Sequence, residues 1–125
     1  CIKTLRAAGY QIVATTPHRT SCTLENFDIS QRSAFFFGVE KEGLSDEVLN
    51  QADAYLTIPM VGFTESLNIS VAAAIIVQSL QQRLKASAVD WQLTSMEKDR
   101  LYLEWLEKSI KSIREIKAHY YAQGN

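Results

Sequence analysis

The chain has 125 residues, which is enough for one domain with a real core but short for an enzyme that binds two substrates. Its formal net charge is −1, with 46% hydrophobic and 22% charged residues, ordinary values for a soluble globular protein. No apolar stretch approaches the roughly 18 residues that a membrane span needs. We find no signal-peptide pattern and expect a cytoplasmic protein with no membrane partner.

Helix and strand patterns alternate through the first two thirds of the chain. Strands are predicted over 10–14, 33–37 and 54–59, and helices over 2–7, 46–52 and 66–86. Residues 23–32 are expected to form a loop or a short helical turn. The aromatic strand 33–37 does not alternate, which predicts burial on both faces, as in a parallel sheet. The order of elements predicts an α/β fold with a mainly parallel sheet and flanking helices.

The helix predicted over 66–86 is unusual because residues 69–77 are apolar nearly all round. Such a helix is buried on more than one side. We expect the sheet to cover one side and another subunit to cover the other.

A polar link over 87–95 separates this region from a second long helix, predicted over 96–121. We therefore place one domain at 1–88 and a C-terminal helical extension at 89–125. From Lys108 onward, four cations accompany the single acidic residue Glu115; they are Lys108, Lys111, Arg114 and Lys117. This basic end fits binding to RNA, and it equally fits the preference of helix C-termini for cations.

Two segments are candidates for a binding site. The first is 38–43, where a glycine at each end lets the backbone approach a ligand and Glu40 is a candidate functional carboxylate. A solvated acidic turn is the alternative. In the second segment, Ser66, Asn68 and Ser70 lead into the apolar helix. Helix capping is the simple role for Ser66 and Asn68. Asn68 and Ser70 also fall inside the region predicted to be buried, where their polar groups need partners that a bound ligand or a second subunit would supply.

Other chemistries lack support. The 38–43 turn matches neither the dinucleotide-binding glycine motif nor a Walker loop. Ser66 is not in a nucleophile elbow, and His18 is expected on a surface loop. Cys1 and Cys22 belong to no CxxC pair, so we expect free thiols and no metal site.

Three stretches taken together resemble a known family: Phe-Gly-Val-Glu-Lys-Glu-Gly-Leu-Ser at 37–45, Leu-Thr-Ile-Pro-Met at 56–60, and Glu-Ser-Leu-Asn-Ile-Ser-Val-Ala at 65–72. They are similar to motifs 2 and 3 of the SpoU/TrmH-type branch of the SPOUT RNA ribose 2′-O-methyltransferases. The resemblance covers about residues 1–86. It implies a C-terminal trefoil knot, a homodimer and S-adenosylmethionine as cofactor. The implied substrate is RNA, with a guanosine in the tRNA D-loop favoured over rRNA. A non-catalytic RNA-binding or dimerisation fragment is the alternative.

The resemblance also assigns residues to roles. Cofactor contacts are implied for Thr15, Thr16, Gly38, Ile58, Met60, Ser66, Leu67 and Asn68. Glu40 and Asn68 are the implied catalytic positions, with Glu40 in a supporting role. The family's motif 1, which carries an asparagine and an arginine, has no match here. We therefore expect the chain to be the C-terminal part of a catalytic domain, which binds the cofactor better than it turns over RNA.

Overall fold

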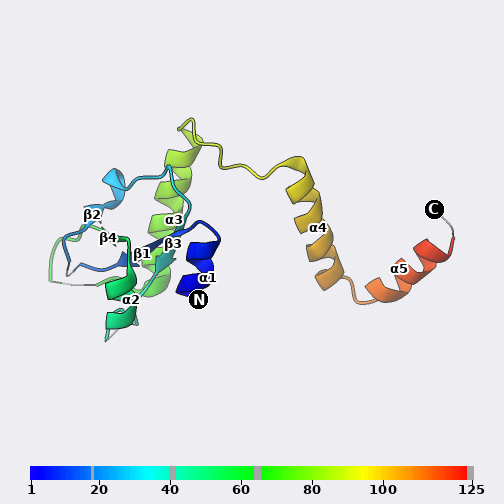
Figure 1. The fold of residues 1–125 in the computed structure, drawn as a ribbon, viewed down its shortest axis with the longest axis horizontal. Helices are drawn as coiled ribbons and strands as arrows, with labels where there is room; N and C mark the ends of the chain where they lie inside the picture. The colour runs from blue at the N-terminus through cyan, green and yellow to red at the C-terminus, as the bar shows by residue number, and fades with distance from the viewer. Residues whose placement is uncertain (18, 40–41, 64–65, 124–125) are drawn as a thin grey trace. The chain divides into compact units, whose positions relative to one another are not determined.

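The structure is a computed structural model, and it describes residues 1–17, 19–39, 42–63 and 66–123. It divides into two compact units, Cys1–Val89 and Asp90–Asn125. The first unit contains α1 (Ile2–Ala7), β1 (Gln11–Thr15), β2 (Cys22–Thr23), the 3₁₀ helix η1 (Leu24–Asn26), β3 (Ser33–Phe36), α2 (Asp46–Gln51), β4 (Ala54–Thr57) and α3 (Ile69–Lys85) (Figure 1).

The four strands form one sheet in the order β2-β4-β1-β3, and every described pair is parallel. The central strand β1 pairs with β3 from Gln11 opposite Ser33, and with β4 from Val13 opposite Ala54. Its residues 12–14 are fully buried, as expected for a strand covered on both faces. The predicted α/β class with a parallel sheet and flanking helices is confirmed.

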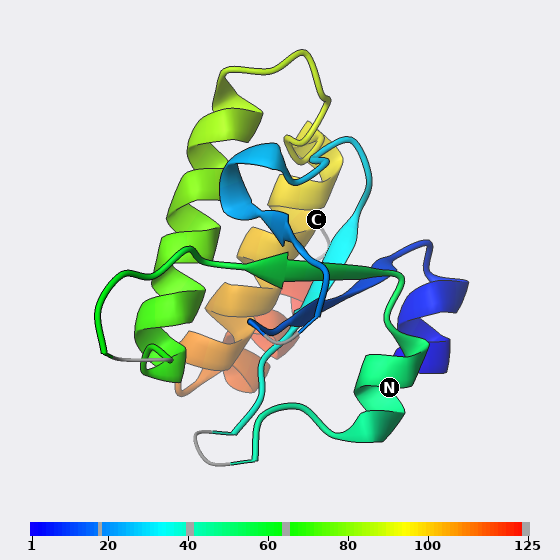
Figure 2. The same ribbon diagram turned by 90° about the vertical axis from the view of Figure 1, so that its left-hand side faces the viewer.

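The core lies between the sheet and α3. Its buried members are Val13, Leu24, Phe27, Leu56 and Ile76, drawn from four elements and the residue that follows η1. Figure 2 shows the strands between α3 on one side and α1 and α2 on the other. Burial of apolar side chains between the sheet and α3 therefore holds the strands in place.

Two arginines tie the outer elements to this core. Arg6 forms an ion pair with Asp53 at 2.8 Å, and the second carboxylate oxygen of Asp53 accepts a hydrogen bond from the Ile12 N–H at 2.7 Å. On the other side, the Arg83 guanidinium in α3 donates to the carbonyls of Leu24 at 2.8 Å and Phe27 at 2.6 Å. Because the two carbonyls flank η1, Arg83 anchors η1 to α3.

Several sequence expectations need correction. The short strand β2 was not predicted, and its second residue, Thr23, falls inside the region expected to be a loop or a short helical turn. The strand β3 is only partly buried, since it lies at the edge of the described sheet. The helix α3 begins at Ile69 rather than near 66, because Asn68 and not Ser66 is its N-cap. Asn68 and Ser70, expected to be buried, are exposed within this chain.

The helix α3 is also less buried than its composition predicts. Ile76 is its one fully buried residue among those described, whereas Ile69, Val71, Ile75 and Val77 are exposed. The single chain covers only one side of this apolar helix.

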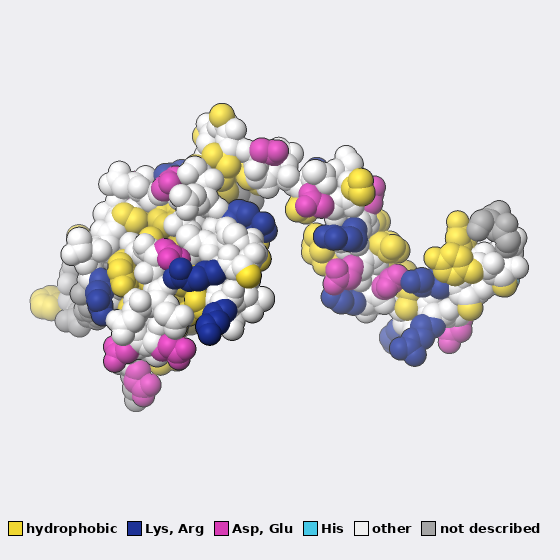
Figure 3. Space-filling model, viewed as in Figure 1, with side chains coloured by type: hydrophobic (Ala, Val, Ile, Leu, Met, Phe, Trp, Pro, Cys, Tyr) yellow, Lys and Arg dark blue, Asp and Glu magenta, His cyan; other side chains and the backbone are white. Residues whose placement is uncertain are grey.

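The second unit holds two helices, α4 (Ser95–Ser109) and α5 (Ile113–Ala122), where a single helix was predicted. The break falls at Ile110, whose extended backbone (φ −90°, ψ 117°) ends α4. A capping box between Thr94 and Glu97 starts α4. Figure 3 shows Lys and Arg interspersed with Asp and Glu along both helices, with hydrophobic side chains at the surface between them. No helix in the described part of the chain is long and apolar enough to cross a membrane.

Candidate functional site

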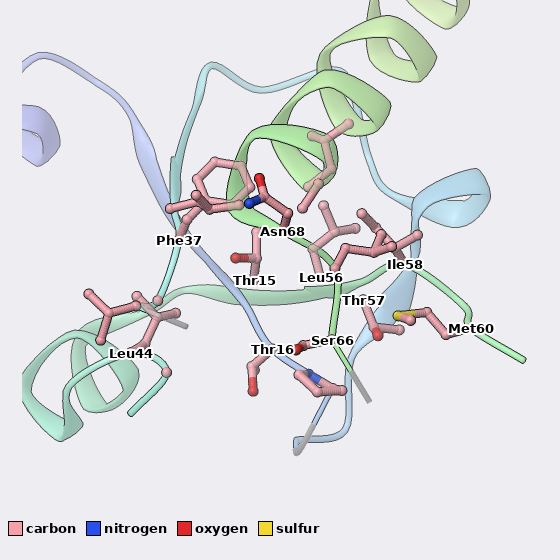
Figure 4. A pocket seen from close by; sticks show the side chains of 18 of the residues that line it. Thr15, Thr16, Phe37, Leu44, Leu56, Thr57, Ile58, Met60, Ser66 and Asn68 are labelled. Atoms are coloured by element: carbon pink, nitrogen blue, oxygen red, sulfur yellow. The ribbon is translucent and has the colours of Figure 1, made fainter. Parts of the chain in front are cut away.

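A cavity of about 410 Å³ opens at the carboxyl ends of β1, β3 and β4. Its lining comes from residues 15–17, 37–39, 42–44, 56–58, 60, 66–69, 72 and 76. In open parallel sheets, ligands bind outside the carboxyl ends of the strands. Four segments that are distant in the sequence therefore meet at the position where this fold class places its sites (Figure 4).

The structure brings together all eight residues that the resemblance assigns to cofactor contacts. These residues are Thr15, Thr16, Gly38, Ile58, Met60, Ser66, Leu67 and Asn68. Glu40, the proposed motif 2 carboxylate, lies outside the described residues.

The glycine-flanked turn after β3 folds back on itself. The Val39 N–H donates to the Gly43 carbonyl and the Gly43 N–H donates to the Val39 carbonyl, both at 2.9 Å. A Cβ on Gly38 would overlap the backbone of Gly43 and Leu44. Gly43 has a φ of +69°, a conformation that favours glycine. Gly38 is therefore required for the close approach of two backbone segments that form one wall of the cavity.

The threonines after β1 connect the strand ends. The Thr15 hydroxyl donates to the Phe36 carbonyl at 2.8 Å, and the Thr16 N–H donates to the Leu56 carbonyl at 3.0 Å. These bonds join β1 to both of its neighbours at the floor of the cavity. The Thr15 side chain thus positions β3, and the first role that the structure supports for it is holding the site together.

Asn68 lies at the entrance to α3 and on the cavity wall. Its Oδ1 accepts a hydrogen bond from the Ser70 N–H at 2.9 Å, which caps the helix. Within the described part of the chain, the Asn68 Nδ2 has no hydrogen-bond partner, so its two N–H groups are available to a ligand. The positive end of the α3 dipole lies at the same place. This wall favours acceptor or anionic groups.

Sequence reasoning missed much of the apolar lining. Phe37, Leu44, Leu56 and Ile76 also face the cavity, and Figure 4 shows Phe37 and Leu56 on either side of Thr15. Phe37 lies at the end of the predicted strand 33–37, so the rule that ligands bind at carboxyl ends was the available indication for it. Leu56 lies in the middle of the strand predicted over 54–59, and its place at the cavity was not indicated. Nothing in the local pattern indicated that Ile76, two turns into a helix, would reach the site.

The described lining contains one ionisable side chain, that of Glu42, and no histidine, lysine or arginine. Such a lining can bind a largely apolar ligand and orient its polar ends, but it offers no good base for an alcohol. The shifted pKa values occur elsewhere: the Ser30 N–H, for example, lowers the pKa of Asp28, which does not line the cavity. Among the described residues, no group of three His, Cys, Asp or Glu side chains could hold a metal ion.

A parallel sheet with a mostly apolar cavity at its carboxyl edge is typical of α/β domains that bind a small molecule. Comparison with known proteins makes the class specific. The model of the SpoU rRNA Methylase family matches residues 1–78, and the chain belongs to this family.

Curated and solved relatives agree with the family match. A tRNA (guanosine(18)-2′-O)-methyltransferase of Borreliella burgdorferi is 48% identical over 111 residues, covering 89% of this chain and 51% of the relative. The crystal structure of the A. aeolicus TrmH/SpoU tRNA modifying enzyme has a TM-score of 0.74 at 30% identity, covering 88% of this chain and 57% of that one. An AdoMet-bound rRNA methyltransferase of Sinorhizobium meliloti has a TM-score of 0.61 at 33% identity, covering 66% of this chain and 32% of that one. The chain thus spans about half the length of the curated relative.

Proposed function

We propose that this chain binds S-adenosylmethionine in the cavity and belongs to an enzyme that methylates a ribose 2′-hydroxyl of RNA. The favoured target is a guanosine of tRNA, because the Borreliella relative is named for guanosine 18 of tRNA; the resemblance implies that this guanosine lies in the D-loop. The observation that carries the proposal is the convergence of residues 15–17, 37–39, 42–44, 56–58, 60 and 66–69 on one cavity. An rRNA target is the alternative within the family, since the Sinorhizobium neighbour is an rRNA methyltransferase.

The cavity fits the proposed cofactor in size and chemistry. Its volume of about 410 Å³ lies in the range of small-molecule sites. Apolar side chains such as Phe37, Leu56 and Ile58 suit a purine ring. The Asn68 Nδ2 and the start of α3 suit the carboxylate or hydroxyl groups of the ligand. Gly38, Thr16, Met60, Ser66 and Leu67 complete the proposed contacts.

When bound, S-adenosylmethionine supplies an electrophilic methyl group on a sulfonium. The residues of this chain hold the donor and exclude water from one side of it, and the Gly38 turn fixes that wall. The ribose hydroxyl must approach in line, at roughly 3 Å from the methyl carbon, and must lose its proton. Carboxylates are poor bases for an alcohol, so Glu40 has a supporting role, and the proton acceptor comes from outside the described lining. The resemblance assigns the activation of the hydroxyl to the asparagine and the arginine of motif 1.

We further propose a homodimer in which a second copy covers the exposed side of α3. The support is the apolar side chains of Val71, Ile75 and Val77, which this chain leaves exposed. Isolated apolar residues at a surface are common, but a row of them on one helix favours association. The resemblance adds a trefoil knot formed by the chain around β4 and α3, and a cytoplasmic location.

The domain division that we propose is a knotted methyltransferase domain over 1–88 and a helical extension over 89–125 that contacts RNA. The support for the extension is the group of cations after Glu107, namely Lys108, Lys111, Arg114 and Lys117. Opposing this, Lys117 pairs with Glu107 at 2.6 Å and Lys108 pairs with Glu104 at 2.5 Å, so two of the four cations already have a partner. Neutralising Lys111 and Arg114 should weaken tRNA binding and reduce its salt dependence. An unchanged affinity would favour the simpler role of cations near helix ends.

Isothermal titration calorimetry of the 125-residue chain with S-adenosylmethionine tests the cofactor proposal directly. Binding with one site per chain is expected, and it should weaken in Asn68→Ala, which removes the available amide. If the folded chain binds neither S-adenosylmethionine nor S-adenosylhomocysteine, the proposed function is wrong.

Methyl transfer is tested with the full-length enzyme that contains these residues. Tritium from labelled S-adenosylmethionine should enter a tRNA transcript, and a transcript with 2′-deoxyguanosine at the target position should accept none. Transfer to the deoxy substrate would mean that the methyl group goes to an atom other than that ribose 2′-hydroxyl. Transfer to rRNA fragments but not to tRNA would select the alternative substrate.

A further inference from the structure

Glu42 has no role assigned by the sequence motifs, yet it is one of the described residues that line the cavity. It stands in the turn between Gly38 and Leu44, one residue before Gly43 and its bond to Val39. Glu42 is exposed, so water reaches its carboxylate. Among the described lining residues it carries the only formal charge at neutral pH.

This charge matters because the methyl donor and its product differ in charge. S-adenosylmethionine and S-adenosylhomocysteine share the same nucleoside and the same amino acid ends. They differ by one methyl group and by the positive charge of the sulfonium, which the product lacks. A negative charge at the cavity therefore attracts the donor more than the product.

We infer that Glu42 makes the cavity selective for the cationic methyl donor over its neutral product. The inference rests on the proposed function, because it concerns the same ligand pair. Once the methyl group has left, the attraction to Glu42 is gone and product release becomes easier. Glu42 acts here through its charge and needs no direct hydrogen bond to the ligand.

Coulomb's law sets the size of the effect. Two unit charges about 6 Å apart in water-like surroundings attract with an energy that corresponds to about a threefold change in affinity. Glu42→Gln removes the charge and should give this threefold change in affinity. Glu42→Lys reverses the charge, which should double the change in binding free energy and give about a ninefold change in affinity. Added salt should weaken both effects, because the Debye length falls from about 10 Å at 0.1 M to about 3 Å at 1 M.

The experiment measures the dissociation constants of both ligands by calorimetry for the 125-residue chain and its variants. Glu47→Gln is the matched control, since Glu47 is an exposed glutamate in the same unit that does not line the cavity. We expect the ratio of the two constants to shift toward the product by about threefold in Glu42→Gln and about ninefold in Glu42→Lys. The control should keep the wild-type ratio, and circular dichroism should show that every variant is folded.

Each result is decisive. If both ligands weaken equally in Glu42→Gln, the residue contributes shape and not charge selectivity, and the inference is wrong. An equal shift in Glu47→Gln would mean that the overall charge of the chain sets the ratio, which also overturns it. If the wild-type chain binds neither ligand, the proposed function itself fails, so the two failures are distinguishable.

Discussion

Substituting Gly38 by alanine is the sharpest test of the cavity wall. The added Cβ would overlap the backbone of Gly43 and Leu44, and neither neighbour can rotate away as a long side chain could. The turn must therefore shift, which stretches the paired hydrogen bonds between Val39 and Gly43. Overpacking of this kind costs about 1–3 kcal/mol.

The cost of this overpacking should also weaken ligand binding. If the wall must return to its original position to hold the ligand, 1–3 kcal/mol corresponds to about a 5- to 150-fold weaker affinity for S-adenosylmethionine. Calorimetry measures the affinity, and urea denaturation measures the free energy of unfolding. Both values should fall in Gly38→Ala.

Gly9→Ala is the matched control. Gly9 has a φ of +80° but nothing within 4 Å of an added Cβ, and it does not line the cavity. Its substitution should lower the free energy of unfolding by about 1–2 kcal/mol through backbone strain, with no change in ligand affinity. The reasoning is refuted if Gly38→Ala binds the ligand as the wild type does, or if Gly9→Ala weakens binding to the same extent.

Two further predictions concern contacts away from the cavity. Arg83→Ala should lower the free energy of unfolding by about 2–3 kcal/mol, because the carbonyls at both ends of 24–27 lose charged donors; an unchanged urea midpoint would contradict this. The pKa of Lys117 is raised, first by its hydrogen bond to Glu107 and then by the negative charge. The contribution of this pair to stability is therefore present below the unfolded pKa of lysine and is lost as the pH rises through the folded pKa. Helicity measured by circular dichroism should therefore fall over that alkaline range in the wild type. The fall should be smaller in Glu107→Gln, because that variant lacks the charged partner of Lys117.

Much of the first unit could be predicted because each local pattern agrees with the fold. Apolar runs bounded by glycine or polar residues predicted β1, β3 and β4, with strand ends that agree with the structure within a residue or two. The strand β2 escaped because two residues, Cys22 and Thr23, are too few to show any period. It exists because Cys22 and Thr23 pair with Leu56 and Thr57 of β4, a contact between distant segments. No window of sequence contains that information.

The break between α4 and α5 was missed for a different reason. Residues 109–112 contain neither proline nor glycine, the two residues that usually interrupt a helix. Apolar residues continue at helical spacing across the break, from Leu106 to Ile110 and Ile113, so the pattern predicted one helix. Fold-back contacts such as the pair between Lys117 and Glu107 are available only once the chain has turned.

Within the cavity, the residues that could be assigned beforehand are those whose type is unusual for their place. Gly38 and Asn68 stand out because glycine before a turn and asparagine at a helix start have specific backbone uses. Leu56 and Ile76 do not stand out, because an apolar residue in a strand or a helix needs no special explanation. The structure adds them through packing, since the same side chains that form the core also form the cavity floor.

The sequence pattern predicts that α3 is buried on more than one side, whereas the single chain leaves one side of this helix exposed. The substitution Val71→Asp tests whether a second copy covers that side. If a second copy covers this side, a buried and unpaired charge should dissociate the dimer, because such a charge costs several kcal/mol. Sedimentation would then show a monomer that still binds S-adenosylmethionine. If α3 instead faces solvent, Asp at a position 46% exposed should alter the free energy of unfolding by only about 0.5 kcal/mol and leave the sedimentation unchanged. Gln31→Asp adds the same charge at an exposed site in the same unit, and it should leave the sedimentation unchanged in either case. A Val71→Asp protein that stays dimeric would mean that the all-round apolar character of α3 has some cause other than association.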